Sequence, residues 1–238
     1  MLFDLRAKGR RRFVKAVYVF LAILIGGGLV FFGIGGSGTG LLDAGGSGNN
    51  TSGNSYESQA VKAEKAAAKP RVTPAVASAQ LSNATRLRFQ AAGAGFDANS
   101  GAYTTDGQTQ LKLAAADWQR YLATVKGQPD VSLAKLMAQA YAVGALTQPK
   151  QAVEAWQIVA AAEPGSAAYA QLAINAYLGN MNEIGDQAAS RALEGLPPAQ
   201  QTTLKGEFKQ AKAQAKAAAA AAVKRAKQNT PSGFTPGG

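Results

Sequence analysis

The longest apolar stretch of the chain lies near its N-terminus, in residues 13–34, with Lys15 as its one charged residue. Residues 16–34 are nineteen residues without a charge, and a helix of that length spans roughly 28 Å, which fits the hydrocarbon core of a bilayer. Basic residues crowd the segment before this stretch, and a Gly/Ser/Asn segment follows it. Because the positive side of a membrane helix stays in the cytoplasm, we predict a single-pass plasma-membrane helix with residues 1–12 cytoplasmic and the C-terminal domain extracytoplasmic.

A cleaved signal peptide is the alternative interpretation of this stretch. Signal peptides have apolar regions of about 7 to 15 residues followed by a small-residue cleavage site, and the GGSGTG sequence that follows offers no such site. Within the stretch, Ala22 and Gly26 have the small-x-x-x-small spacing that can pair membrane helices, although ordinary membrane-helix composition also produces it. The pattern favours an uncleaved signal-anchor.

Residues 35–74 lack the periodic apolar positions of a packed element. Residues 35–58 are rich in Gly, Ser and Asn, a composition typical of flexible linkers. Residues 59–69, QAVKAEKAAAK, favour helix locally but show no apolar stripe, and Pro70 ends the segment. We predict a flexible linker and a semi-ordered spacer that hold the next domain away from the bilayer.

From residue 75 onward, apolar residues recur at helical spacing, without the alternation typical of strands. The pattern predicts an all-α domain over residues 75–200, with a loop at 93–107. The expected helices cover residues 74–92, 108–126, 131–144, 150–162, 166–178 and 183–195.

Prolines divide this domain into units of similar length. Pro129, Pro164 and Pro197 are 35 and 33 residues apart, with two predicted helices between successive prolines. A period near 34 with two helices per unit is typical of a helical solenoid. Large, small and aromatic residues also recur at matching positions of the two units: Leu136, Met137, Ala140 and Tyr141, then Ala152, Trp156, Val159 and Pro164 in one; Tyr169, Leu172, Ala173 and Ala176, then Ala189, Ala192 and Pro197 in the other.

On these residues the chain resembles the tetratricopeptide repeat family. The resemblance implies that small residues let paired helices approach closely while aromatics fill the spaces between units. Three features depart from the family pattern: a longer turn at residues 145–149, Gly185 where the family usually places alanine, and the loop at residues 93–107. A generic helical bundle is the alternative, because alanine-rich hairpins imitate the motif.

The C-terminal part is predicted to form one basic, alanine-rich helix over residues 201–228, which follows Pro197 and Pro198. Residues 229–238 are predicted to be a disordered tail. Four lysines of the predicted helix fall at i, i+4, i+7 and i+11, so they share one stripe of the helix. This stripe is a candidate site for a polyanion such as anionic lipid or cell-wall polymer, and a solvated helix face is the alternative. The stripe comprises Lys205, Lys209, Lys212 and Lys216.

Composition narrows the chemistry that the chain can perform. It contains neither cysteine nor histidine, which excludes disulfides, thiolate or imidazole catalysis and Cys/His zinc sites. The net charge of +11 is concentrated at the two ends, since residues 75–200 carry eight Lys/Arg and nine Asp/Glu. No nucleophile or phosphate-loop motif is present. We therefore expect no enzyme activity, cofactor, metal or small-molecule substrate, and nucleic acid is the least favoured polyanion because base-stacking aromatics are missing from the stripe.

The remaining candidate is a surface for protein partners. Most aromatics are expected to pack between helices, but Tyr141 and Tyr177, with Gln171 and Asn175, could instead line a groove that grips a peptide or a partner helix. The layout is similar to bacterial tetratricopeptide proteins beside the secretion translocon, and the cysteine-free, Ala/Gly-rich composition is typical of a bacterial, actinobacterial protein. The expected function is a membrane-anchored scaffold for other envelope or exported proteins, with a polyanion tether as the alternative.

Overall fold

The computed structural model describes residues 51–228, and the side chains of residues 53–226. The predicted cytoplasmic segment (1–12), transmembrane helix (13–34), first part of the linker (35–50) and C-terminal tail (229–238) lie outside the described residues. Among the helices in residues 51–228, none combines the length and apolar character needed to cross a bilayer.

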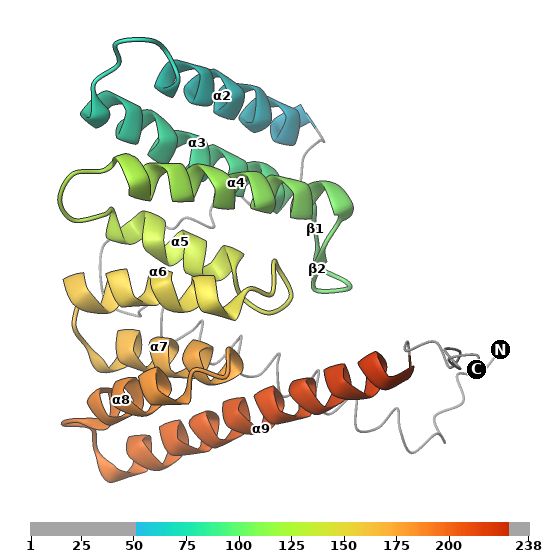
Figure 1. The fold of residues 1–238 in the computed structure, drawn as a ribbon, viewed down its shortest axis with the longest axis vertical. Coiled ribbons are helices and arrows are strands. Elements are labelled where there is room, and N and C mark those ends of the chain that lie inside the picture. The colour runs from blue at the N-terminus through green and yellow to red at the C-terminus, as the bar shows by residue number, and fades with distance from the viewer. Residues whose placement is uncertain (1–50, 229–238) are drawn as a thin grey trace, which may run out of the picture. The chain divides into compact units, whose positions relative to one another are not determined.

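The described part of the chain is almost entirely helical, which confirms the prediction of an all-α domain. Eight helices and one short hairpin of two-residue strands follow one another along residues 51–228 (Figure 1). Their bounds are α2 Thr51–Ala67, α3 Pro74–Ala94, β1 Phe96–Asp97, β2 Ala102–Tyr103, α4 Thr105–Thr124, α5 Val131–Ala140, α6 Pro149–Ala162, α7 Ser166–Leu178, α8 Asn182–Leu193 and α9 Pro198–Gln228.

The helices pack as consecutive hairpins. The pairs α3/α4, α5/α6 and α7/α8 form three units, named here the first, second and third unit. Helix α5 contacts both helices of the first unit, α6 packs on α7, and α9 packs on α7 with a smaller contact to α8 (Figure 1). Helical repeats are built in this way, each unit covering a face of the next.

Side-chain caps explain where several helices begin. The side-chain oxygens of Thr73, Thr104 and Asp130 each accept a hydrogen bond from the backbone N–H three residues further on. Such a cap satisfies one of the free donors at a helix N-terminus and stabilises the helix by about 1 kcal/mol. The cap at Thr104 starts α4 at Thr105, three residues before the start predicted from apolar spacing alone.

The core is made of alanine interleaved with a few large side chains. The largest side chains with almost no exposed area include Trp118, Tyr141, Leu133 and Met137. Trp118 stacks on Tyr121, with ring centroids 5.4 Å apart. Small residues between these allow close approach of the helix backbones. The buried alanines of the three units include Ala84, Ala92, Ala114, Ala134, Ala140, Ala152, Ala155, Ala173, Ala176 and Ala192.

The prediction of an unpacked linker over residues 35–74 is wrong for residues 51–67. These residues form α2, which packs along α3 and buries Ala60 and Ala63. The stripe that α2 presents to α3 consists of alanines, which have too little hydropathy to stand out in a segment rich in Gly, Ser and Asn. The charged partners of α2 lie on α3 and α4, so local composition gave no sign of them.

The predicted loop at 93–107 is a tight hairpin in the structure. Strand β1 pairs antiparallel with β2, so that Phe96 faces Tyr103 with ring centroids 5.1 Å apart. A Cβ on Gly95 would lie 2.7 Å from Thr104 Oγ1 and 2.9 Å from the Gly107 backbone. Glycine at these two positions therefore lets the end of α3 and the start of α4 lie in direct contact.

Candidate binding surfaces

Tyr141 is buried, at 1% exposed, as expected for an aromatic residue that packs between helices. It also lines a groove of about 370 Å³ together with residues of α4 and α6. Burial raises the pKa of Tyr141, and a hydrogen bond with Gln119 opposes that rise. The other lining residues are three glutamines (Gln119, Gln148 and Gln151), two alanines (Ala115 and Ala116) and Glu154. We call this surface the amide groove.

Tyr177 is also buried, at 2% exposed, and it anchors α9. Its hydroxyl donates a hydrogen bond of 2.9 Å to Asp186 Oδ1, and Lys212 Nζ donates one of 2.8 Å to the same oxygen. The Lys212 ammonium also lies 4.3 Å from the centre of the Tyr177 ring, and Phe208 meets that ring edge-on at 5.9 Å. One tyrosine thus joins α7, α8 and α9.

Gly185 is the reason that the Tyr177 ring fits. A Cβ at position 185 would lie 2.5 Å from Tyr177 Cε1, closer than any real contact. The departure from the tetratricopeptide pattern at this position therefore has a packing cause: the ring occupies the space that an alanine methyl group would fill.

We expect Gly185→Ala to lower the free energy of unfolding by about 1 to 3 kcal/mol, because overpacking forces a buried ring out of place. In a chain that also carries Tyr177→Leu, Gly185→Ala should cost less, because the ring that it would displace is gone. Thermal unfolding followed by circular dichroism measures both. Gly206→Ala is the matched control, since a Cβ there meets nothing within 4 Å; if it and Gly185→Ala shift the midpoint equally, the packing explanation is wrong.

The other two predicted groove residues stay near the surface of α7. Gln171 and Asn175 are half-buried. The side-chain amide of Asn175 donates a 2.8 Å hydrogen bond to the backbone carbonyl of Gln171. This contact lies within one helix turn, so part of the hydrogen-bonding capacity of the Asn175 amide is used within its own helix. The structure does not bring these amides together with either buried tyrosine ring into a common groove.

The predicted packing residues of the second and third units are buried, with three exceptions. Pro164 and Pro197 are exposed in the turns that end α6 and α8. Tyr169 is half-buried, and its hydroxyl accepts a hydrogen bond of 3.1 Å from Arg191. These prolines therefore mark helix ends and do not fill the core. The buried residues are Leu136, Ala140, Ala152, Trp156, Leu172, Ala173 and Ala192.

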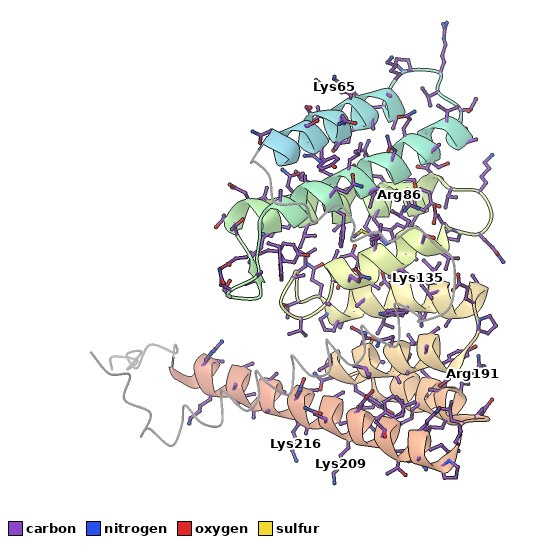
Figure 2. All side chains as sticks on the ribbon, turned by 180° about the vertical axis from the view of Figure 1, so that it is seen from behind. Lys65, Arg86, Lys135, Arg191, Lys209 and Lys216 are labelled. Atoms are coloured by element: carbon purple, nitrogen blue, oxygen red, sulfur yellow. The ribbon has the colours of Figure 1, made fainter. Side chains whose placement is uncertain are left out.

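The predicted lysine stripe is divided by its contacts. Lys205, Lys209 and Lys212 line a groove of about 360 Å³ beside Tyr177 and Phe208. Hydrogen bonds from Lys212 and Tyr177 lower the pKa of Asp186, so Lys212 is engaged in holding α9. Lys209 and Lys216 project from α9 away from the other helices (Figure 2).

Between Lys216 and Ala226, α9 has no buried residue. Phe208, Ala211 and Ala215 pack against the preceding helices, whereas every residue from Lys216 to Ala226 is exposed. After Glu207 the sequence contains no acidic residue. The distal half of α9 is therefore a basic helix with no acidic side chain of its own to neutralise it.

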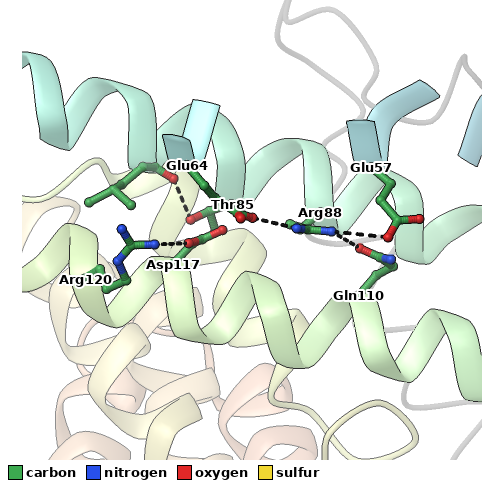
Figure 3. A network of polar contacts seen from close by, with 8 residues as sticks. Glu57, Glu64, Thr85, Arg88, Gln110, Asp117 and Arg120 are labelled. Atoms are coloured by element: carbon green, nitrogen blue, oxygen red, sulfur yellow. Dashed lines mark hydrogen bonds and ion pairs between the residues drawn. The ribbon is translucent and has the colours of Figure 1, made fainter. Parts of the chain in front are cut away.

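A buried charged network lies where α2, α3 and α4 meet, and the sequence analysis missed it (Figure 3). Arg88 of α3 is 3% exposed. Its guanidinium donates to Glu64 of α2, with Nη2 2.7 Å from Oε1, and to Gln110 of α4 at 2.8 Å. A second α2 carboxylate, Glu57, lies 3.7 Å from Nη1. Alternation of Glu and Lys in residues 57–65 gave no reason to expect a buried partner.

Asp117 of α4 is the least satisfied member of this network. It is 3% exposed, and Arg120 donates to its Oδ1 at 3.1 Å. Its other oxygen, Oδ2, has no donor around it. Burial and the neighbouring Glu64 carboxylate raise the pKa of Asp117 to about 7. A proton on Asp117 would donate to Glu64 and join the two carboxyl groups.

Within residues 51–228, no three acidic side chains lie close enough to hold a metal ion. Comparison of the chain with models of protein families, with curated proteins and with solved structures gives no match.

Proposed function

We propose that this protein is a membrane-anchored, tetratricopeptide-like scaffold that binds other envelope or exported proteins outside the cytoplasm, near the secretion translocon. The observation that carries the proposal is the stack of three helical hairpins, each in contact with the next. Stacked hairpins present extended surfaces that suit polypeptide partners better than small substrates. The apolar stretch at 13–34 and the basic residues before it support the anchor and its orientation.

The amide groove is the surface that we assign to the partner. Gln119, Gln148 and Gln151 offer side-chain donors and acceptors without charge, and such groups pair with the backbone of an extended peptide. The tyrosine hydroxyl at the floor of the groove adds one more polar atom. This surface shares Tyr141 with the groove predicted from sequence but does not include Gln171, Asn175 or Tyr177.

Photocrosslinking in the native membrane tests this proposal. A photoreactive amino acid at Gln119 or Gln151 of the full chain should capture exported or translocon proteins, identified by mass spectrometry. The same amino acid at Gln187, an exposed glutamine of α8 outside both grooves, is the matched control. Capture that is equally strong at Gln187, or absent at both groove positions, contradicts the assignment.

A second candidate function is a polyanion tether built on the distal half of α9. The observation in its favour is the exposed, acid-free segment from Lys216 onward. Basic residues near an anionic bilayer contribute about 1 kcal/mol each. Truncation after Lys216 is the appropriate test, because it keeps the buried Phe208, Ala211 and Ala215 in place. A tether should lose salt-sensitive binding to anionic vesicles, whereas a scaffold should keep its crosslinked partners.

A further inference from the structure

Helix α2 is held to the rest of the domain mainly by charge and by small side chains. Its buried apolar residues, Ala60 and Ala63, are both alanine, so they remove little apolar area from water. Ala67, partly buried, also packs against the core, and Glu57 and Glu64 form ion pairs with Arg88 of α3. A helix attached in this way depends on the charge state of its contacts.

The charges at this interface do not balance when every carboxyl group is ionised. Glu57 and Glu64 face the network from α2, Arg88 from α3, and Asp117 and Arg120 from α4. Arg120 is half exposed, so water screens its charge. Arg86, the other arginine of α3, binds Asp130 instead. The buried part of this network thus contains two carboxyl groups, those of Glu64 and Asp117, and one cation, the Arg88 guanidinium.

We propose that α2 is a releasable strap whose docking on α3 and α4 requires one proton shared between Glu64 and Asp117. With the proton present, Asp117 donates to Glu64, and Glu64 remains paired with Arg88. The carboxyl groups of Glu64 and Asp117 are neighbours (Figure 3), so without the proton two carboxylates face each other, and Oδ2 of Asp117 has no donor. Release of α2 carries Glu64 away and lets water reach Asp117. This strap is a property of the domain that goes beyond the proposed binding function.

The direction of the pH dependence follows from the pKa of Asp117. In the docked state this pKa is raised to about 7, whereas a solvated aspartate has a pKa of about 3.9. The docked state therefore holds a proton that the released state gives up between about pH 4 and pH 7. Docking is strongest in acid, weakens as the pH rises through that window, and levels off above it.

The absence of native cysteine permits a direct measurement on the full chain. A single Ala63→Cys reporter on the buried side of α2 is treated with a pyridyl disulfide at pH 5 and pH 8. The protection factor is the labelling rate of Lys62→Cys, an exposed position on the same helix, divided by that of Ala63→Cys. We expect the resulting protection factor to fall at least tenfold from pH 5 to pH 8, because each pKa unit of difference corresponds to a tenfold change.

Two variants make the result specific to the shared proton. Asp117→Asn, which keeps the shape and can donate to Glu64 at every pH, should hold the protection factor within about twofold across the same range. Glu207→Gln is the matched control: burial also raises the pKa of Glu207, but this residue lies on α9, so the α2 response should persist.

Four outcomes would overturn the proposal. The first is a protection factor that does not change between pH 5 and pH 8. The second is an equal fall in Asp117→Asn, which would place the titrating group elsewhere. The third is an equal fall at an Ala155→Cys reporter in the core of α6, where Ala155 is 0% exposed, because that would show unfolding of the whole domain. Absence of protection at pH 5 would show that α2 is not docked and would refute the strap as well.

Discussion

Arg88→Met is expected to lower the free energy of unfolding by about 3 to 5 kcal/mol, the usual cost of removing one partner of a buried ion pair. The methionine fills much of the volume of the arginine stem but leaves Glu64 and Gln110 without their donor. Asp117, already short of a donor on Oδ2, loses the nearest buried positive charge. Thermal unfolding of the full chain, in detergent, measures the loss.

The control lies two residues away on the same helix. Arg86 is one-third exposed and makes a single 2.7 Å ion pair with Asp130, so Arg86→Met should cost about 1 kcal/mol or less. Adding Glu64→Gln and Asp117→Asn to Arg88→Met should recover most of the stability, because the uncompensated charges are then removed. Equal losses for the two arginine variants would show that burial of the network is energetically unimportant.

Tyr141→Ala is expected to cost about 3 to 5 kcal/mol, as truncation of a buried aromatic side chain does. The ring is 1% exposed and belongs to the core that joins the units. Tyr141→Phe keeps the ring and loses only the hydrogen bond with Gln119 at the edge of the amide groove, so it should cost about 1 kcal/mol. Urea unfolding of both variants measures the difference.

The same pair of variants separates packing from binding. Tyr169→Ala serves as the comparison, because this tyrosine is half-buried and contacts Arg191 at the surface; its loss should be clearly smaller. If Tyr141→Ala unfolds like the unmodified chain yet abolishes crosslinking at Gln119, then Tyr141 acts in recognition and the packing interpretation is wrong.

Helical periodicity was sufficient to predict most of the domain. The structure places α6, α7 and α8 within two residues of the predicted spans, since each has large apolar residues at 3.6-residue spacing and a turn residue at its end. Helix α5 is the exception. It ends at Ala140, and the chain then folds into a turn in which the backbone N–H of Gln148 donates to the Tyr141 carbonyl. The apolar residues at 141–146 continue the helical spacing, so the predicted helix extended four residues too far, to residue 144.

The candidate sites could be predicted less well, because they depend on pairs of residues far apart in the chain. Arg88 and Glu64 are 24 residues apart, and Lys212 and Asp186 are 26 apart. Nothing near Arg88 in the sequence distinguishes it from Arg86, although one is buried and the other partly exposed. The sequence allowed two interpretations of Tyr141 and Tyr177: packing between helices, or lining a groove for a partner. Only their burial in the structure decides between these.

The close fit of Gly185 against Tyr177 limits how interchangeable the repeats are. Helix α9 caps the third unit through Tyr177, Asp186 and Lys212 together, and neither of the other units has been shaped around that combination. A chimaera that moves α9 onto another repeat should therefore carry Gly185, Tyr177 and Asp186 with it as one cassette. For protein engineering, α9 and the surface of the third unit that it covers should be transferred together. The transferable unit at the C-terminal end therefore comprises three helices, α7, α8 and α9.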